Sequence, residues 1–263
     1  MSQLHAVSFH VGEGKANHPV KPGTSALDWE AESIRKAAVS IAHMGPDLLA
    51  LQGVRDRVKS GPLLSEFVAA GNFEDVLFLP QRSVLAAKCA ERRGKHLTGV
   101  GVALASRYRI RRARLLSLPE SDDEGTLDAV LAIFAPASRV HVAILAQVEA
   151  PGRDIFVATT CLSRQKALRA LQLTFVRQQL DDFAVAYGGP GAPRAILGSL
   201  GMPVAELRGA LSTPNVTELP TTPIEHPTLV TDYFVGSAVR FSSLETQVLP
   251  VSDHRALRGN LIF

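Results

Sequence analysis

The sequence predicts an α/β protein: a four-layer α/β/β/α sandwich in which two packed mixed β-sheets are flanked by helices. Short apolar runs typical of buried strands alternate with segments of helical periodicity in the early and late parts of the chain. A predicted hairpin lies between them. With 263 residues, 46% of them hydrophobic, the chain can bury one large core. Together these features favour two layers of strands between two layers of helices.

The N-terminal part is expected to hold two strands around a helix. Residues 4–11 alternate in the manner of a strand. A loop rich in Gly, Pro and Asn follows over residues 12–25. Residues 28–44 carry apolar side chains at helical spacing, and Gly45 with the proline after it ends that helix. Residues 47–54 form a continuous apolar run, which is typical of a strand buried on both faces.

The later elements follow from the same patterns. The predicted helices are residues 62–70 and 163–186. The predicted strands are residues 76–80, 129–134, 139–147, 155–160, 194–198, 229–235 and 256–263. The second and third of these strands form the hairpin. Two basic stretches, residues 88–96 and 107–114, either bind an anion or protect a strand edge with solvated charges.

The composition favours a single domain, residues 1–263, in the cytoplasm. The formal net charge is only +3, and without a clustered basic patch this excess does not predict nucleic-acid binding. The two cysteines, Cys89 and Cys161, provide no disulfide framework, so a reducing compartment is expected. The first residues lack the pattern of a secretion signal, and no apolar run is long enough to span a membrane.

Carboxylate and imidazole groups lie at the ends of the last two predicted strands. Asp232 lies in the first of them, and Asp253 and His254 directly precede the second. A carboxylate and a histidine delivered by neighbouring strand ends can meet, and the carboxylate then fixes the tautomer of the imidazole. The same residues also suit a turn aspartate that caps a backbone amide beside a surface histidine.

The segments DYFVGS (residues 232–237) and VSDHRAL (residues 251–257) resemble the C-terminus of the endonuclease/exonuclease/phosphatase superfamily, which includes the deoxyribonuclease I-like enzymes. Residues 46–53, PDLLALQG, resemble that family's Pro-Asp-apolar-Gln-Glu block. Residues 101–110, GVALASRYRI, resemble its GxAxxSRYxI block. The resemblance covers nearly the whole chain in the family's order. It implies two packed sheets flanked by helices.

The resemblance maps eight of the family's site positions onto this chain. Three keep the family residue, and these are Asp232, Asp253 and His254. Five differ from it, and these are His10, Gly53, Cys161, Ser199 and Gly201. The segments that form the scaffold still match the family's blocks, whereas most of the site positions carry a different residue. We therefore expect the fold to be retained and the family's metal-dependent reaction to be lost.

The expected loss follows from the chemistry of magnesium. Mg²⁺ requires several oxygen ligands, including at least one or two carboxylates. Gly53 stands where the family's central glutamate would be and offers no side-chain oxygen, and Ser199 offers only a neutral hydroxyl. We therefore predict no metal and no other cofactor, and weak metal-dependent phosphodiesterase activity is the least favoured reading. The ligand types of zinc or iron are present, but their spacing does not require a metal; they are His10, Cys161, Asp253 and His254.

The resemblance implies a hydrogen-bonded Asp232–His254 pair, which would act as a general base near neutral pH. Asp253 lies beside it in the sequence, and His10 is expected to enter the same cleft. Cys161 would face the pair from the other side, either as a nucleophile or as a residue that only fills space.

Two classes of function follow. The first is a repurposed, metal-independent enzyme that acts on a small organic molecule by acid/base chemistry, such as isomerisation, cyclisation or hydrolysis. The second is a pseudoenzyme that binds a protein partner or a ligand. The small residues Gly53, Ser199 and Gly201 are expected to open volume in the cleft, which favours the enzyme. The candidate binding residues are Lys15, His18, Ser199 and Arg107.

Overall fold

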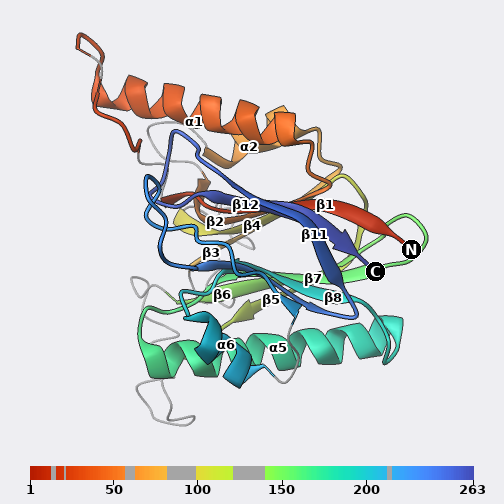
Figure 1. Cartoon of the computed structure of the whole chain (residues 1–263). Coiled ribbons are helices and arrows are strands. Elements are labelled where there is room, and N and C mark those ends of the chain that lie inside the picture. Colours follow the sequence, from red (N-terminus) through yellow and green to blue (C-terminus); the bar gives the residue numbers. More distant parts are fainter. Residues whose placement is uncertain (13–15, 21, 57–62, 82–98, 121–139, 212–214) are drawn as a thin grey trace, which may run out of the picture.

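Two six-stranded mixed sheets pack face to face, as the sequence predicts (Figure 1). The computed structural model describes residues 1–12, 16–20, 22–56, 63–81, 99–120, 140–211 and 215–263. The first sheet contains, in spatial order, β11 (Arg240–Gln247), β12 (Ala256–Ile262), β1 (Gln3–His10), β2 (Leu48–Asp56), β4 (Gly99–Ser106) and β3 (Asp75–Pro80). The second contains β5 (Ile110–Ser117), β6 (Val142–Val148), β7 (Ile155–Cys161), β8 (Arg194–Ser199), β10 (Asp232–Ser237) and β9 (Asn215–Val216).

Helices cover the outer face of each sheet and complete the four layers. Helices α1 (Ala26–Met44) and α2 (Leu63–Gly71) lie on the first sheet, and α5 (Lys166–Gly188) and α6 (Val204–Ala210) lie on the second (Figure 1). Helix α1 begins where the Ser25 side chain accepts a hydrogen bond from the backbone of Asp28, and it ends at Gly45, whose φ is +63°. None of the described helices is long and apolar enough to cross a bilayer.

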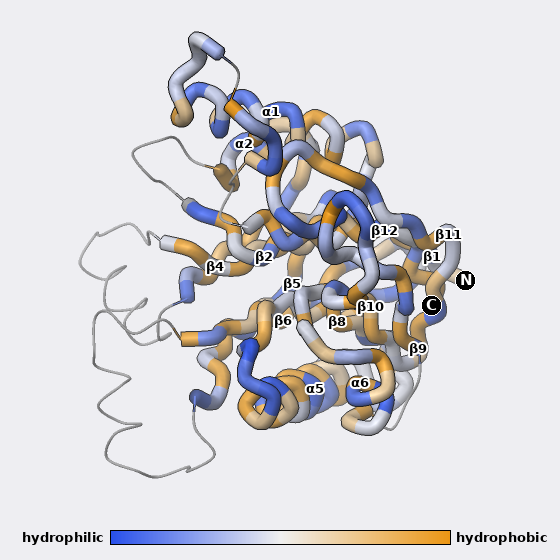
Figure 2. The backbone as a smooth tube through the Cα atoms, turned by 60° about the vertical axis from the view of Figure 1, so that its left-hand side comes forward, coloured by the Kyte–Doolittle hydropathy of each residue, from blue (hydrophilic) through white to orange (hydrophobic). Residues whose placement is uncertain are grey.

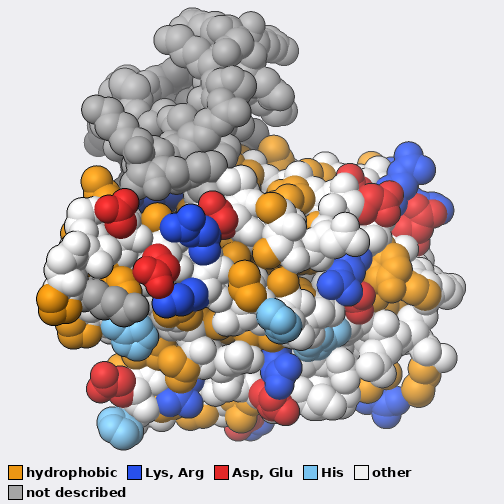
Figure 3. Space-filling model, turned by 90° about the horizontal axis from the view of Figure 1, so that it is seen from above, with side chains coloured by type: hydrophobic (Ala, Val, Ile, Leu, Met, Phe, Trp, Pro, Cys, Tyr) orange, Lys and Arg blue, Asp and Glu red, His pale blue; other side chains and the backbone are white. Residues whose placement is uncertain are grey.

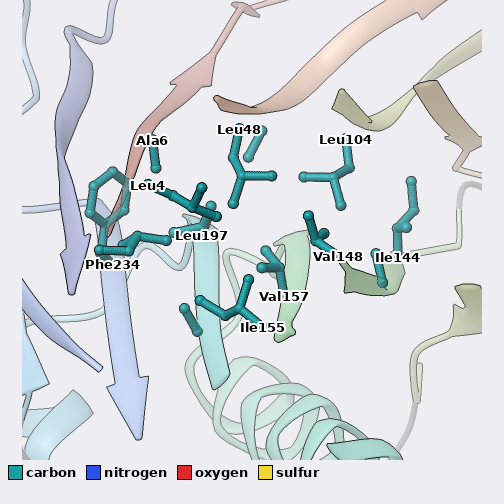
Figure 4. Packing of buried hydrophobic residues seen from close by; sticks show 14 of the residues in the cluster. Leu4, Ala6, Leu48, Leu104, Ile144, Val148, Ile155, Val157, Leu197 and Phe234 are labelled. Carbon is teal, nitrogen blue, oxygen red and sulfur yellow. The ribbon is translucent and has the colours of Figure 1, made fainter. Parts of the chain in front are cut away.

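The main core lies between the two sheets. Leu4, Leu48 and Leu104 project from the first sheet towards Val157 and Leu197 of the second (Figure 4). Separate apolar clusters fill the space between each sheet and its helices. In Figure 2 the hydrophobic residues accordingly follow the strands and the helix faces turned towards them. Each sheet is therefore buried on both faces over its central strands, which explains their continuous apolar runs.

Several predicted boundaries change in the structure. The strand predicted from residue 229 begins at Asp232, because Leu229 instead forms an isolated bridge with Thr222 and is 58% exposed. The long helix predicted from residue 163 begins at Lys166. Strand β11 was not predicted, since its sequence RFSSLETQ alternates poorly and its pairing with β12 shifts between Ser242 and Glu245.

Some predicted features fall outside the described residues. These are the basic stretch at residues 88–96, the first strand of the predicted hairpin at residues 129–134, and Lys15. The other basic stretch belongs to β5, the edge strand of the second sheet, whose arginines are exposed. This placement matches the reading in which charges protect a strand edge.

Candidate functional site

The strand order brings five predicted site residues to one edge of the sandwich. His10 and Cys161 end β1 and β7, and Ser199 ends β8. Strand β10 runs antiparallel to β8 and pairs Asp232 with Ser199. Strand β12 runs antiparallel to β1, so the segment before it, with His254, returns to the His10 end. The carboxyl ends of parallel strands and the amino ends of their antiparallel neighbours thus meet at this edge.

Asp232 is fully buried and is held by three hydrogen bonds to a single oxygen. Its Oδ2 accepts from Nδ1 of His254 at 2.7 Å, from Oγ1 of Thr221 at 2.6 Å and from Oγ1 of Thr231 at 3.0 Å. Burial acts to raise the pKa of this carboxyl, but the hydrogen bond and charge of His254 outweigh it. The pKa of Asp232 therefore lies below its usual value, and the group is a carboxylate at neutral pH.

His254 presents one nitrogen to the buried carboxylate and the other to the exposed side chain of Asp253. Its Nδ1 bonds to Asp232, and its backbone N–H donates to Oγ of Ser252 at 3.0 Å. Its Nε2 lies 3.8 Å from Oδ1 of Asp253, whose side chain is 75% exposed, and the His254 side chain itself is 13% exposed. Burial acts to lower the pKa of His254, but the bond to Asp232 outweighs it and raises that pKa. His254 is thus an oriented imidazole whose Nε2 is the nitrogen left for chemistry.

His10 packs against His254, but its pKa is shifted in the opposite direction. The two ring centroids are 4.5 Å apart with an interplanar angle of 32°. Burial, and then the neighbouring His254, lower the pKa of His10 to about 4. His10 is therefore neutral at physiological pH, when its neighbour is the more readily charged ring.

Cys161 lies beside His10 rather than beside His254. Its Sγ is 4.0 Å from Nδ1 of His10, and the side chain packs against the core between the sheets. Burial, and then the charge of Asp232, raise the pKa of the thiol to about 12. A thiol that stays protonated at neutral pH is a poor nucleophile, so its surroundings favour the space-filling reading.

The chain's resemblance to known proteins lies in its structure. No protein-family model matches the sequence, and no curated protein matches it. A solved endonuclease/exonuclease/phosphatase from Bacteroides vulgatus has a TM-score of 0.70 to this chain, is 15% identical and is covered over 100% of both chains. The chain has the endonuclease/exonuclease/phosphatase fold.

Two further structures with this fold illustrate its range. A mannosyl-6-phosphatase from Bacteroides thetaiotaomicron is 13% identical with a TM-score of 0.65, over 99% of this chain and 100% of that one. A truncated TDP2 from Caenorhabditis elegans is 15% identical with a TM-score of 0.63, over 99% of this chain and 98% of that one. At these identities the likeness establishes the fold alone.

The magnesium site implied by the endonuclease/exonuclease/phosphatase fold does not fit the residues present. Gly53 has a φ of +65° at a bulge in β2, and a Cβ there would lie 3.5 Å from Cε1 and Nε2 of His10. A Cβ at residue 53 would thus be in ordinary van der Waals contact with the imidazole of His10. Asp253 is exposed, and Ser199 supplies no charge. Within the described residues, no three His, Cys, Asp or Glu side chains are grouped to hold a metal ion.

The expectation of open volume at the cleft floor stays a prediction. A Cβ at Gly53 would lie 3.5 Å from the ring of His10. A Cβ at Gly201, whose φ is +60°, would lie 3.8 Å from Nη1 of Arg169. Each glycine thus has a neighbouring side chain at van der Waals distance from the position that a Cβ would take.

The structure places two of the remaining binding candidates, Arg107 and His18. Arg107 directly follows β4, whose antiparallel pairing puts Ser106 opposite Leu48 at the start of β2, whereas Gly53 lies near the other end. Arg107 is therefore not a residue of this site. His18 is exposed, and its backbone carbonyl accepts a hydrogen bond from Nε1 of Trp29.

Sequence reasoning missed the groups that support the Asp232–His254 pair. Thr221 and Thr231 both donate to the carboxylate, and their hydroxyls lie 3.0 Å apart. Arg164, which is exposed, lies close enough to act electrostatically on both histidines. The adjacent Thr231 and Asp232 could have indicated one of these contacts. The contact from Thr221 depends on how the segment around residue 221 folds back against Asp232, which no local sequence pattern specifies.

Charged side chains of both signs are mixed on the face that carries the first sheet's helices. In Figure 3, which views the molecule from above, the basic and acidic side chains of the described residues are interspersed over this face. Recognition of a phosphate backbone depends instead on clustered basic residues.

Proposed function

We propose that this protein is a metal-independent acid/base enzyme that acts on a small organic molecule, with His254 as the proton-transfer group and Asp232 as its positioning residue. The observation that carries the proposal is the 2.7 Å hydrogen bond between Nδ1 of His254 and the buried Oδ2 of Asp232. A carboxylate in this position fixes the tautomer of the ring and stabilises its protonated form.

Nε2 of His254 is the atom that exchanges the proton. When the ring is neutral, Nδ1 keeps its hydrogen for Asp232 and Nε2 accepts a proton from the substrate or from an attacking water molecule. When the ring is charged, the same nitrogen donates a proton to a leaving group or to an adjacent carbon. Isomerisation, cyclisation and hydrolysis all use these two steps.

The neighbours of His254 favour negative charge on the substrate as the proton leaves it. Arg164 acts electrostatically on the ring and is exposed to solvent at the end of β7. A fixed cation beside a developing anion stabilises the transition state more than the ground state. His10, being neutral, does not add a second cation that would compete with protonation of His254.

A binding protein without catalytic activity is the second candidate. It is favoured by the low exposure of the His254 side chain, 13%. On this reading the Asp232–His254 pair is retained because removing either partner would leave a buried group unpaired.

Comparison of the wild-type protein with His254→Gln tests the proposal. Each protein is incubated with a small-molecule cell extract, with and without EDTA, and mass spectrometry identifies compounds that are consumed. We expect at least one compound to be consumed by the wild type with or without EDTA, and its turnover to fall about a hundredfold or more in His254→Gln. His43→Gln is the matched control, because it makes the same change at an exposed histidine in the last turn of α1.

Three outcomes would contradict the proposal. Equal turnover by His254→Gln would remove the proposed proton-transfer group. Turnover abolished by EDTA would indicate metal-dependent chemistry. Consumption of no compound by a folded wild-type protein would favour the binding protein. Thermal denaturation of each variant separates lost chemistry from lost folding.

A further inference from the structure

A cavity lies at the opposite end of the second sheet from the Asp232–His254 pair. It has a volume of about 140 Å³ and lies between α5, the start of β8 and the end of β10. Strand β10 reaches from Asp232 at one end to Ser237, which lines the cavity, at the other. Five steps of about 3.3 Å along the strand separate the two places by roughly 16 Å. The cavity is therefore not part of the histidine cluster.

The floor of the cavity is apolar and belongs to the core beneath α5. Its apolar residues are each no more than 7% exposed, and they are Leu180, Ile196, Leu211 and Val235. A cavity of about 150 Å³ with such a lining is large enough for benzene. The floor therefore suits a compact apolar group of about that size.

The rim of the cavity carries one positive charge in excess. Arg177, Asp181 and Arg194 line it, so two guanidinium groups share one carboxylate. Nε of Arg194 lies 2.5 Å from Oδ1 of Asp181 but is not aligned for a hydrogen bond, and Nε of Arg177 is 3.7 Å from Oδ2. Asp181 thus neutralises one arginine at most. The second charge is available to a ligand.

We propose that this cavity binds a small organic monoanion, a carboxylate on a compact apolar body, with Arg177 as its charge partner. A guanidinium presents parallel N–H donors that match the two oxygens of a carboxylate. The Arg177 side chain is 37% exposed, so its fork reaches the mouth of the cavity while the apolar body rests on the floor. A dianion would keep one negative charge that is not paired with an arginine. The apolar floor offers that charge no hydrogen-bond donor.

Titration with sodium benzoate at constant ionic strength, followed by methyl NMR, tests the site. We expect saturable shifts at the methyl groups of Leu180, Ile196 and Val235. Benzamide, which has the same shape without the charge, should bind at least about tenfold more weakly. Arg177→Gln should weaken benzoate binding about tenfold or more, as loss of a charge-assisted hydrogen bond does.

Arg111→Gln is the matched control, because Arg111 is 48% exposed and also pairs with a carboxylate, but it lies on β5. Benzoate binding should be the same in this variant as in the wild type. The proposal is overturned if benzoate gives no saturable shifts, if the shifts map outside the cavity, if benzamide binds equally well, or if Arg177→Gln leaves the affinity unchanged.

Discussion

His10 and His254 lie side by side but respond oppositely to acid. His254 gains a partner on folding, so its folded pKa lies above the unfolded value of 6.5, whereas burial lowers the pKa of His10 to about 4. His254 therefore stabilises the protein fully below pH 6.5, and that stabilisation is lost as the pH rises through its folded pKa. His10 has the reverse effect, because between pH 6.5 and 4 the unfolded chain binds a proton that the folded chain excludes.

The pH dependence of stability should expose this difference through His10→Asn. The free energy of unfolding of the variant, relative to the wild type, should rise by on the order of 2–3 kcal/mol between pH 7.5 and pH 4.5. Urea denaturation at both pH values measures it. Any cavity that the substitution leaves lowers the free energy of unfolding equally at both pH values, so it does not contribute to the difference between them. A pH-independent difference would mean that His10 is protonated as readily in the folded protein as in the unfolded chain.

At the residue scale, the sequence predicted the Asp232–His254 pair because both residues lie in segments that still resemble the family's sequence blocks. It did not predict that the ring of His10 would lie beside Gly53. That contact joins two residues on neighbouring strands, and neither residue alone indicates the position of the other's side chain. The thiol of Cys161 was ambiguous for a similar reason, since burial decides its pKa and burial is a property of the assembled strands.

Among the elements, strand β2 carries a backbone feature on which the candidate site depends. Its pairing with β4 shifts between Gln52 and Val54, and Gly53, which lies between them, has a φ of +65°. This conformation is unfavourable for residues with a Cβ. The bulge also brings Gly53 against the imidazole of His10, so two constraints act on a single position.

Gly53→Glu should therefore destabilise the protein more than Gly45→Glu. Gly45 has a similar φ of +63°, but it is only half-buried and a Cβ there would meet nothing within 4 Å, so that variant carries mainly the backbone strain. We expect about 1–2 kcal/mol for the strain, and a further loss at Gly53, because that position is buried and the added carboxylate would be desolvated there. Urea denaturation of both variants gives the comparison. Equal destabilisation would show that the surroundings of Gly53 accept the carboxylate.

The element boundaries show which signals the sequence carried. Helix α1 was predicted closely because Gly45 supplies a left-handed cap. The start of β10 was predicted three residues early because Leu229, although apolar, lies outside the sheet and is exposed. Strand β11 was missed because an edge strand with a shifted register has neither a buried run nor regular alternation.

The whole molecule depends on one core shared by two sheets. The fold was predictable because many buried strands read as apolar runs and because several blocks kept the family's order. The shared core implies that the two sheets unfold together, although α1 and α2 lie on the opposite side of the molecule from α5 and α6 (Figure 1).

Leu197→Ala tests this cooperativity. Leu197 lies on β8 in the second sheet and is fully buried, so the substitution should cost about 2–5 kcal/mol. Trp29, the only tryptophan of the chain, lies on α1 over the first sheet and is 7% exposed. The midpoint of the Trp29 fluorescence transition should fall as far as that of the circular dichroism signal. Leu27→Ala, at a position 62% exposed, should change both by little.

An unchanged Trp29 midpoint in Leu197→Ala would contradict a single cooperative unit. It would indicate instead that the first sheet and its helices keep their structure while the second unfolds.

The backbone at Gly53 also limits the routes by which this chain could acquire metal-dependent chemistry. An acidic side chain at residue 53 meets a strained backbone at a buried position, so that substitution alone lowers stability without assembling a magnesium site. The neighbouring positions supply little of what is missing, because Ser199 carries no charge and the Asp253 side chain is 75% exposed. Several substitutions would therefore have to occur together, and the first of them would only lower the stability of the protein.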